Sequence, residues 1–196
     1  MIATHKKTLT LEEYLRYDDG TDAHRYELWN GQLIDMGAES DINIVIGSLL
    51  SFVLSQIVPY YCVRRGTEIC VEGELANTRF PDLLVVTEEG AKALAGKKRS
   101  MVTLDMPAPA LVVEVVSNSE EDARSRDRDY INKRQEYAIR NIPEYWIVDP
   151  VKNIILVLTL KEKRYQEQQF SGQQKIKSMV FPTLDLVANQ VLEAEL

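Results

Sequence analysis

The sequence predicts an α/β fold in which a mixed sheet is flanked by helices and extended by β-hairpins. The chain has 196 residues, 45% of them hydrophobic and 27% charged, which suits one globular core. Short runs rich in β-branched residues, typical of buried strands, alternate with stretches of helical periodicity. No repeat or linker composition divides the sequence. We therefore expect residues 1–196 to form a single domain.

The N-terminal third carries signals for a helix, a hairpin and a second helix. Thr10 and Glu13 form a T-x-x-E capping box, which starts helices. Asn30-Gly31 is a strong hairpin signal, because both turn residues must adopt positive φ. Ser40 or Asp41 can cap a helix whose apolar residues recur at helical spacing. The expected elements are a helix over Thr10–Tyr17, a hairpin of Arg25–Trp29 and Gln32–Met36, and a helix over Asp41–Val58.

The middle of the chain predicts strands that are separated by a polar segment, called the excursion below. Gly66 is expected to break a strand-rich stretch, and Pro81 stands at the entry of an apolar strand, where a missing N–H is tolerated. Pro143 is expected to end the long helix that follows the central strand. The expected elements are strands over Tyr60–Val71 and Arg79–Val86, an excursion over Glu88–Met106 that is helical near Ala91–Ala95, a strand over Leu111–Val116, and a helix from Glu121 to Arg140.

The C-terminal third predicts more β-structure. A buried strand, Glu144–Asp149, precedes an Asp-Pro turn, and its Tyr145 and Trp146 are expected in the core. The remaining elements are a hairpin of Ile154–Leu160 and Arg164–Phe170, a short strand near Ile176, and a small helix over Leu186–Leu192.

Charge and cysteine content limit the kinds of binding partner and cellular compartment that the sequence suits. A net charge of −7 and a pI near 5.0 argue against a dedicated nucleic-acid binder, because phosphate contacts depend on Lys and Arg. An acidic protein can still act on nucleic acid through a metal ion and a local patch. Cys62 and Cys70 form no disulfide framework or CxxC motif, and we find no signal peptide or membrane-spanning run. A reduced, cytoplasmic protein that does not enter membranes is expected.

One carboxylate interrupts the most apolar strand. Glu114 lies within Leu111–Val116, a run typical of a strand buried on both faces. An ionised glutamate there costs several kcal/mol unless a positive or hydrogen-bonding group meets it. We expect Glu114 to be met by a metal ion, by Asp82 at the start of the neighbouring strand, and by Lys133.

Two further residues break apolar patterns in the same way. Glu27 lies among apolar neighbours in the first hairpin strand. Lys133 shares one helix face with Tyr130 and Tyr137, at offsets of three and four residues. A helix that packs back on the sheet after the central strand would direct Lys133 toward Glu114.

This combination of residues favours one kind of chemistry. Carboxylates that converge in a partly dry site repel one another unless a divalent cation neutralises them. Because the only histidines are His5 and His24, Mg²⁺ or Mn²⁺ suits the site better than Zn²⁺. A metal-bound water beside a lysine is the arrangement used in metal-assisted phosphodiester hydrolysis.

The order of these motifs resembles a known family. The motifs are Arg25-Tyr26-Glu27-Leu28 with Asn30-Gly31, Phe80-Pro81-Asp82, the run from Leu111 to Ser117, Lys133 with Tyr137, and the run from Ile142 to Pro150. Together they resemble the Uma family of putative restriction endonucleases, within the PD-(D/E)XK nuclease superfamily. The resemblance implies a restriction-endonuclease-like core, a Mg²⁺ or Mn²⁺ cofactor and DNA as the substrate. It also implies Asp82, Glu114 and Val115 as metal ligands, Glu27 as a further member of the acidic cluster, and Lys133 as the catalytic amine.

Two positions depart from the usual patterns. The superfamily usually places a lysine two residues after the second acid, where this chain has Val116. The Uma-like pattern instead takes its lysine from the following helix, which Lys133 matches. Many family members have a histidine near the start of the second helix, where this chain has Asn43, and we assign Asn43 no role.

Each candidate residue also has a purely structural interpretation. Asp82 suits a strand-entry turn, and Glu114 suits an ion pair with Lys133 or with an arginine of residues 124–128. Glu27 could face solvent from an alternating strand, and Lys133 could lie on the surface. Two functions follow from these alternatives. One is a Mg²⁺-dependent nuclease, and the other is a catalytically inactive nuclease fold that serves as an oligomeric binding or regulatory protein. A homodimer is expected in either case.

Overall fold

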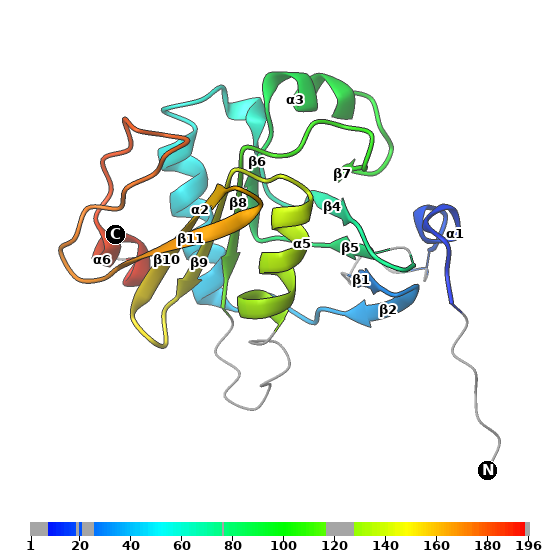
Figure 1. Ribbon diagram of the computed structural model, residues 1–196, viewed down its shortest axis with the longest axis horizontal. Helices are drawn as coiled ribbons and strands as arrows, with labels where there is room; N and C mark the ends of the chain where they lie inside the picture. Colours follow the sequence, from blue (N-terminus) through cyan, green and yellow to red (C-terminus); the bar gives the residue numbers. More distant parts are fainter. Residues whose placement is uncertain (1–7, 19, 21–25, 76, 117–127, 195–196) are drawn as a thin grey trace, which may run out of the picture.

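A six-stranded mixed sheet forms the centre of the computed structural model, which describes residues 8–18, 20, 26–75, 77–116 and 128–194. Its strands are β3 (Val63–Arg64), β6 (Leu83–Val85), β8 (Leu111–Val115), β9 (Glu144–Asp149), β10 (Ile154–Lys161) and β11 (Arg164–Phe170). They lie in the order β11-β10-β9-β8-β6-β3 (Figure 1). Only β8 and β9 run parallel among these neighbours. The α/β class with a mixed sheet that the sequence predicts is therefore confirmed.

Helices cover both faces of this sheet. They are α2 (Asp41–Leu54), α5 (Lys133–Ile139) and α6 (Ala188–Leu192). α2 contacts β3, β8 and α6, whereas α5 contacts β11. Figure 1 shows α2 behind the sheet and α5 in front of it. Because side chains alternate along a strand, β8 presents Glu114 to the α5 side and Val113 and Val115 to the other.

Two smaller sheets lie beside the main one. They comprise β1 (Tyr26–Trp29) with β2 (Gln32–Asp35), and β5 (Asn77–Arg79), β4 (Glu68–Val71) and β7 (Met101–Val102) in the order β5-β4-β7. The β1–β2 hairpin is attached to β5, because the Leu28 N–H donates to Thr78 Oγ1 at 3.0 Å and the Asn30 N–H donates to Asn77 Oδ1 at 2.5 Å. This attachment places β1 and its Glu27 beside β5. The remaining elements are α1 (Leu11–Leu15), η1 (Tyr60–Cys62), α3 (Glu88–Leu94) and the π-helical turn η2 (Arg128–Asn132).

The local signals near the N-terminus are confirmed. Thr10 and Glu13 form the expected capping box, with reciprocal bonds of 2.9 and 3.1 Å. Asn30 and Gly31 have φ of 46° and 73°, as a two-residue hairpin turn requires. The Ser40 side chain caps α2.

Three expected elements are shorter or divided. α2 ends at Leu54 rather than Val58, where the approach to Pro59 disfavours further helix. The strand expected from Tyr60 begins instead as the 3₁₀ turn η1, although the break at Gly66 is present with φ of 71°. The strand expected over Arg79–Val86 is split into β5 and β6, because Pro81 has no N–H for a ladder. The excursion over Glu88–Met106 holds α3 and the short strand β7.

The C-terminal half follows the prediction closely. The strand β9 and the β10–β11 hairpin lie where they are expected, and Tyr145 and Trp146 are fully buried. The first part of the expected helix from Glu121 lies outside the described residues, and its described part runs from Arg128 to Ile139. Lys175 makes an isolated bridge to Val187 near the expected short strand, and α6 follows it. Within the described residues, no helix combines the length and apolar character needed to cross a membrane.

Candidate active site

Lys133 lies between two buried carboxylates. Its Nζ is 2.8 Å from Glu114 Oε2 and 3.5 Å from Glu27 Oε1. All three residues are almost completely buried, with exposures of 2%, 4% and 1% for Lys133, Glu114 and Glu27. Buried charges require this kind of pairing, because each would otherwise lose its hydration without compensation. The structure thus brings together three of the four residues singled out in the sequence.

The chain connection between β8 and β9 explains how Lys133 reaches Glu114. Parallel neighbours need a crossover connection, and α5 lies in the segment that joins these two strands. A crossover helix packs back on the sheet that it leaves. Lys133 is the first residue of α5, and Glu114 lies on the face of β8 that α5 covers. Sequence spacing and topology together therefore place the amine over the carboxylate.

Tyr137 fixes the second oxygen of Glu114. One helical turn after Lys133, its hydroxyl donates to Glu114 Oε1 at 2.8 Å. Complete burial, and then the nearby Glu114 carboxylate, raise the pKa of Tyr137 well above its ordinary value. The phenol therefore stays protonated and remains a donor. The edge of its ring packs against Tyr145, with centroids 5.0 Å apart, which restricts its orientation further.

Glu27 is anchored by a network that the sequence analysis missed. Its Oε1 accepts the Phe80 N–H at 3.0 Å, and its Oε2 lies 3.7 Å from Nη1 of the fully buried Arg79. Arg79 also donates two hydrogen bonds to Glu136, from Nε to Oε2 at 2.8 Å and from Nη2 to Oε1 at 2.5 Å. Burial acts to lower the pKa of Arg79, but Glu27 and Glu136 together raise it, so Arg79 stays charged. Burial is also the main reason why the pKa of Glu136 is raised.

Asp82 and Asn43 both bond to the backbone of Val115, the last residue of β8. The Val115 N–H donates to Asp82 Oδ2 at 2.6 Å, and Asp82 is only half-buried. The Val115 carbonyl accepts a bond of 3.1 Å from Asn43 Nδ2. Asn43 itself is 5% exposed and accepts from the Ser40 hydroxyl at 2.8 Å. The sequence assigns no role to Asn43. In the structure, its side chain links the start of α2 to the backbone of the residue after Glu114.

These contacts decide several of the alternatives left open by the sequence. The surface positions considered for Glu27 and Lys133 are wrong, because both side chains are buried. The ion pair considered for Glu114 with Lys133 is present. Val116, at the position of the usual superfamily lysine, is a buried apolar residue. The amine that lies next to Glu114 is that of Lys133.

The oxygen donors near the end of β8 have the chemistry that Mg²⁺ and Mn²⁺ prefer. They are the carboxylates of Asp82 and Glu114 and the carbonyl of Val115, which keeps a second lone pair beside its bond to Asn43. Among the described residues, no group of three or more His, Cys, Asp or Glu side chains is arranged to hold a metal ion. A cation at this place would have two carboxylates, one carbonyl and water as its ligands.

Comparison with known proteins places the chain in a family. The model of the family Uma2, described as "Putative restriction endonuclease", matches residues 11–189. The fold is similar to a crystal structure described as "a putative nuclease belonging to DUF820 from Anabaena variabilis ATCC 29413", with a TM-score of 0.68 and 15% identity over 95% of this chain and 98% of that chain. That likeness shows the restriction-endonuclease-like fold that the sequence predicts. None of the curated proteins matches the chain. Because the family match spans most of its length, the chain belongs to the Uma2 family of putative restriction endonucleases.

Proposed function

We propose that this protein is an endonuclease that hydrolyses phosphodiester bonds in DNA with the help of Mg²⁺ or Mn²⁺. The observation that carries the proposal is the buried ammonium group of Lys133, held 2.8 Å from Glu114, with Asp82 bound to the next residue of the same strand. An amine beside two carboxylates at the end of a strand suits a charged phosphate transition state. The family and the fold support a nuclease more generally.

Asp82, Glu114 and the Val115 carbonyl would hold the cation, and Glu27 would complete the acidic surroundings. When bound, a divalent cation supplies a water of lowered pKa and neutralises charge on the phosphate. Asp82 is the most exposed of the three acids, so it is the one that solvent reaches most readily. Glu114 keeps a fixed orientation, because one oxygen contacts Lys133 and the other accepts the Tyr137 hydroxyl.

Lys133 would act by donating hydrogen bonds. Its ammonium group has three N–H donors, and the two carboxylates on either side hold it in place. A donor fixed in advance can orient an attacking water or stabilise charge that develops on a phosphate oxygen. Because Arg79 and the Phe80 N–H also hold Glu27, the amine remains positioned from both sides.

A cleavage assay on Asp82→Asn tests the proposal. We expect the wild-type protein to cut single- or double-stranded DNA with Mg²⁺ or Mn²⁺, and EDTA to abolish the cutting. Asp82→Asn keeps the shape of the side chain but removes its charge, and we expect the rate to fall by about 100-fold or more. The matched control is Asp185→Asn, at an exposed aspartate paired with Lys175, which should cut at the wild-type rate. Intact DNA with either metal, or equal rates for Asp82→Asn and wild type, would contradict the proposal.

One observation favours the second candidate, a nuclease fold that binds a partner without catalysis. Lys133 and Glu114 already form a close ion pair, which a structural role would explain equally well. That protein would show no metal-dependent cleavage, and Asp82→Asn would leave its partner binding unchanged. The homodimer and the cytoplasmic location expected from the sequence stay predictions.

A further inference from the structure

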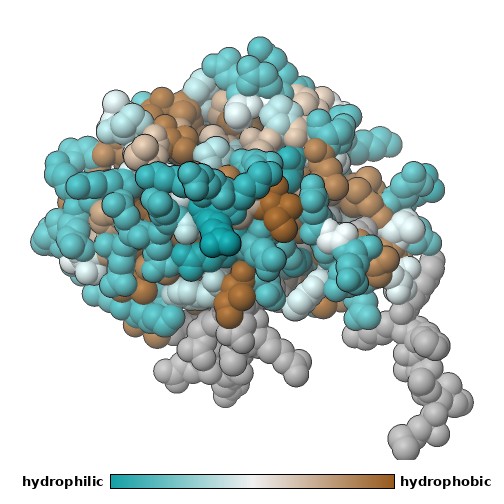
Figure 2. Space-filling model, in the orientation of Figure 1, coloured by the Kyte–Doolittle hydropathy of each residue, from teal (hydrophilic) through white to brown (hydrophobic). Residues whose placement is uncertain are grey.

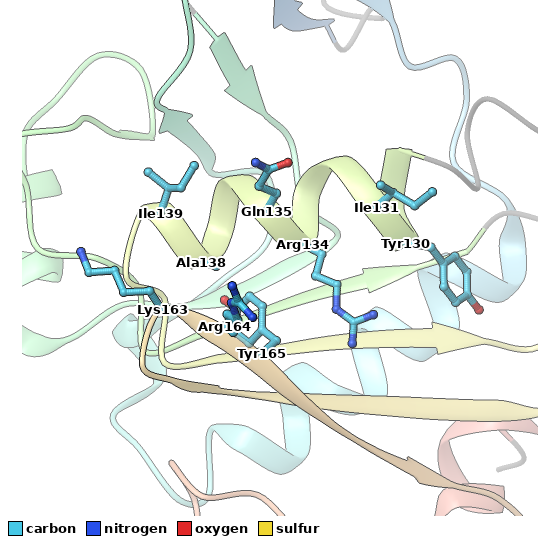
Figure 3. A pocket seen from close by; sticks show the side chains of 9 residues that line it. All are labelled: Tyr130, Ile131, Arg134, Gln135, Ala138, Ile139, Lys163, Arg164 and Tyr165. Atoms are coloured by element: carbon cyan, nitrogen blue, oxygen red, sulfur yellow. The ribbon is translucent and has the colours of Figure 1, made fainter.

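A groove of about 580 Å³ runs between α5 and the β10–β11 hairpin. In Figure 3, Ile131, Arg134 and Ile139 line it from the helix, and Lys163 and Arg164 line it from the hairpin. Lys133 and Tyr137 are buried against the sheet, so the groove uses a different face of α5. The front of the molecule in Figure 1 carries both elements, and in Figure 2 this front shows small apolar patches within a hydrophilic surface.

The charged side chains that line the groove are basic, although the whole protein is acidic. Arg134, Lys163 and Arg164 line it, and none of the described lining residues is an acid. At its Tyr130 end, Lys152 Nζ lies 4.1 Å from the centroid of the tyrosine ring and also forms an ion pair of 3.3 Å with Asp149. The chain as a whole has a net charge of −7. A local cluster of this sign is the electrostatic footprint of a polyanion site.

The hairpin turn holds its lysine in an unfavourable backbone conformation. Lys161 pairs with Arg164, so Glu162 and Lys163 form a two-residue turn, with φ of 47° and 66°. Glycine or asparagine is preferred at such positions, because a side chain at positive φ is strained. The turn thus presents a cation to the groove from a position where glycine would fit better.

One end of the groove is lined by η2, the turn that directly precedes Lys133 in the chain. Tyr130, which lies in this turn, is three residues before Lys133. From Tyr130 to Ile139 the helix extends about 13 Å, which matches roughly four nucleotides of one DNA strand. The tyrosine rings and the exposed Ile131 and Ile139 offer surfaces for sugars and bases between the charged contacts.

We propose that this groove binds the sugar–phosphate backbone of the nucleic-acid substrate on one side of the bond that is cut. The proposal rests on the proposed nuclease function and assigns a substrate-binding role to residues outside the acidic site. Arg134, Lys163 and Arg164 contact phosphates, and Lys152 with Tyr130 guides the strand toward Lys133. Glu167, which is 2.6 Å from Arg134, competes with phosphate for that guanidinium group.

The test compares two double variants with the same loss of charge. Lys163→Gln/Arg164→Gln removes two groove cations, and Lys97→Gln/Lys98→Gln removes two exposed lysines from the turn after α3. A fluorescein-labelled 20-nucleotide DNA, single-stranded and as a duplex, is titrated in EDTA at several salt concentrations. We expect the groove variant to bind about tenfold more weakly and to lose about two units from the slope of log K against log salt. We expect the control variant to retain the wild-type slope.

Cleavage kinetics separate this proposal from the nuclease function. If the protein cuts DNA, the groove variant should raise KM without lowering kcat. If the two double variants cleave DNA with equal KM and bind it equally, the groove does not bind the substrate, but the nuclease function is supported. If binding depends on the groove and no cleavage occurs, the groove binds DNA, but the nuclease function is contradicted. No binding to either probe at low salt overturns the groove.

Two single variants distinguish binding from a structural role. Glu167→Gln releases Arg134 from its acid, so we expect tighter DNA binding and a steeper salt dependence. Lys163→Gly relieves the positive φ at the turn, so we expect a higher unfolding temperature together with weaker DNA binding. If Lys163→Gly changes stability alone, the lysine has no part in binding and the assignment of the turn is overturned.

Discussion

Replacing Arg79 by methionine is expected to destabilise the fold by about 3–5 kcal/mol, which is most of the stability of a typical domain. Arg79 is fully buried between Glu27 and Glu136, so its removal takes the ion-pair partner from Glu136 and one cation from Glu27, which keeps Lys133. Methionine keeps an unbranched apolar stem but does not fill the space of the guanidinium group, so the loss combines charge and packing. Urea unfolding of both proteins in EDTA measures the difference in the free energy of unfolding.

Arg134→Met is the matched control for that measurement. Arg134 also pairs with a glutamate at 2.6 Å, but its side chain is 32% exposed and that of its partner Glu167 is 40% exposed. An exposed pair contributes about 0–1 kcal/mol, because water and salt screen it. Equal losses of stability for the two variants would show that burial does not set the value of the Arg79 network.

Lys133→Met is expected to slow cleavage strongly and to make the stability of the protein depend on metal. Removing the amine should lower the rate by about 10²–10³-fold, the usual effect of losing a transition-state donor. Without Lys133, Glu27 and Glu114 face each other across a buried space and disfavour the folded state. A divalent cation bound by these acids would offset the repulsion, so we expect Mn²⁺ to raise the Tm of Lys133→Met more than that of wild type.

The control for this second variant is Lys92→Met, at an exposed lysine in α3. It should cut at the wild-type rate and show the wild-type response to Mn²⁺. A wild-type cleavage rate for Lys133→Met would contradict the catalytic role of Lys133. An unchanged Tm of Lys133→Met in Mn²⁺ would contradict the binding of a cation by these acids.

Much of the fold could be predicted because its signals are local. The capping box at Thr10 and the turn at Asn30-Gly31 act within a few residues, and both are formed as expected. The site was partly predictable for a related reason. Glu114 interrupts a strand of buried residues, and such a carboxylate must have a partner. A lysine on the crossover helix was the available partner, and Lys133 is 2.8 Å away.

The missed residues depend on contacts between distant parts of the chain. Arg79 and Glu136 are 57 residues apart, and neither breaks its local pattern strongly enough to show that they meet. Asn43 reaches a backbone carbonyl 72 residues away, and a bond to the backbone leaves no mark on the partner's side chain. Pro81 breaks the strand locally, but neither its missing N–H nor the apolar pattern shows that β5 and β6 belong to different sheets.

Titration of Mn²⁺ by calorimetry into wild type, Asp82→Asn and Glu114→Gln tests the central claim most directly. That claim is that Asp82 and Glu114 hold a divalent cation beside Lys133. We expect wild type to bind Mn²⁺, and each variant to bind at least about tenfold more weakly, whereas Asp185→Asn should bind as wild type does. Absence of Mn²⁺ binding by wild type, or one affinity shared by all four proteins, would contradict it.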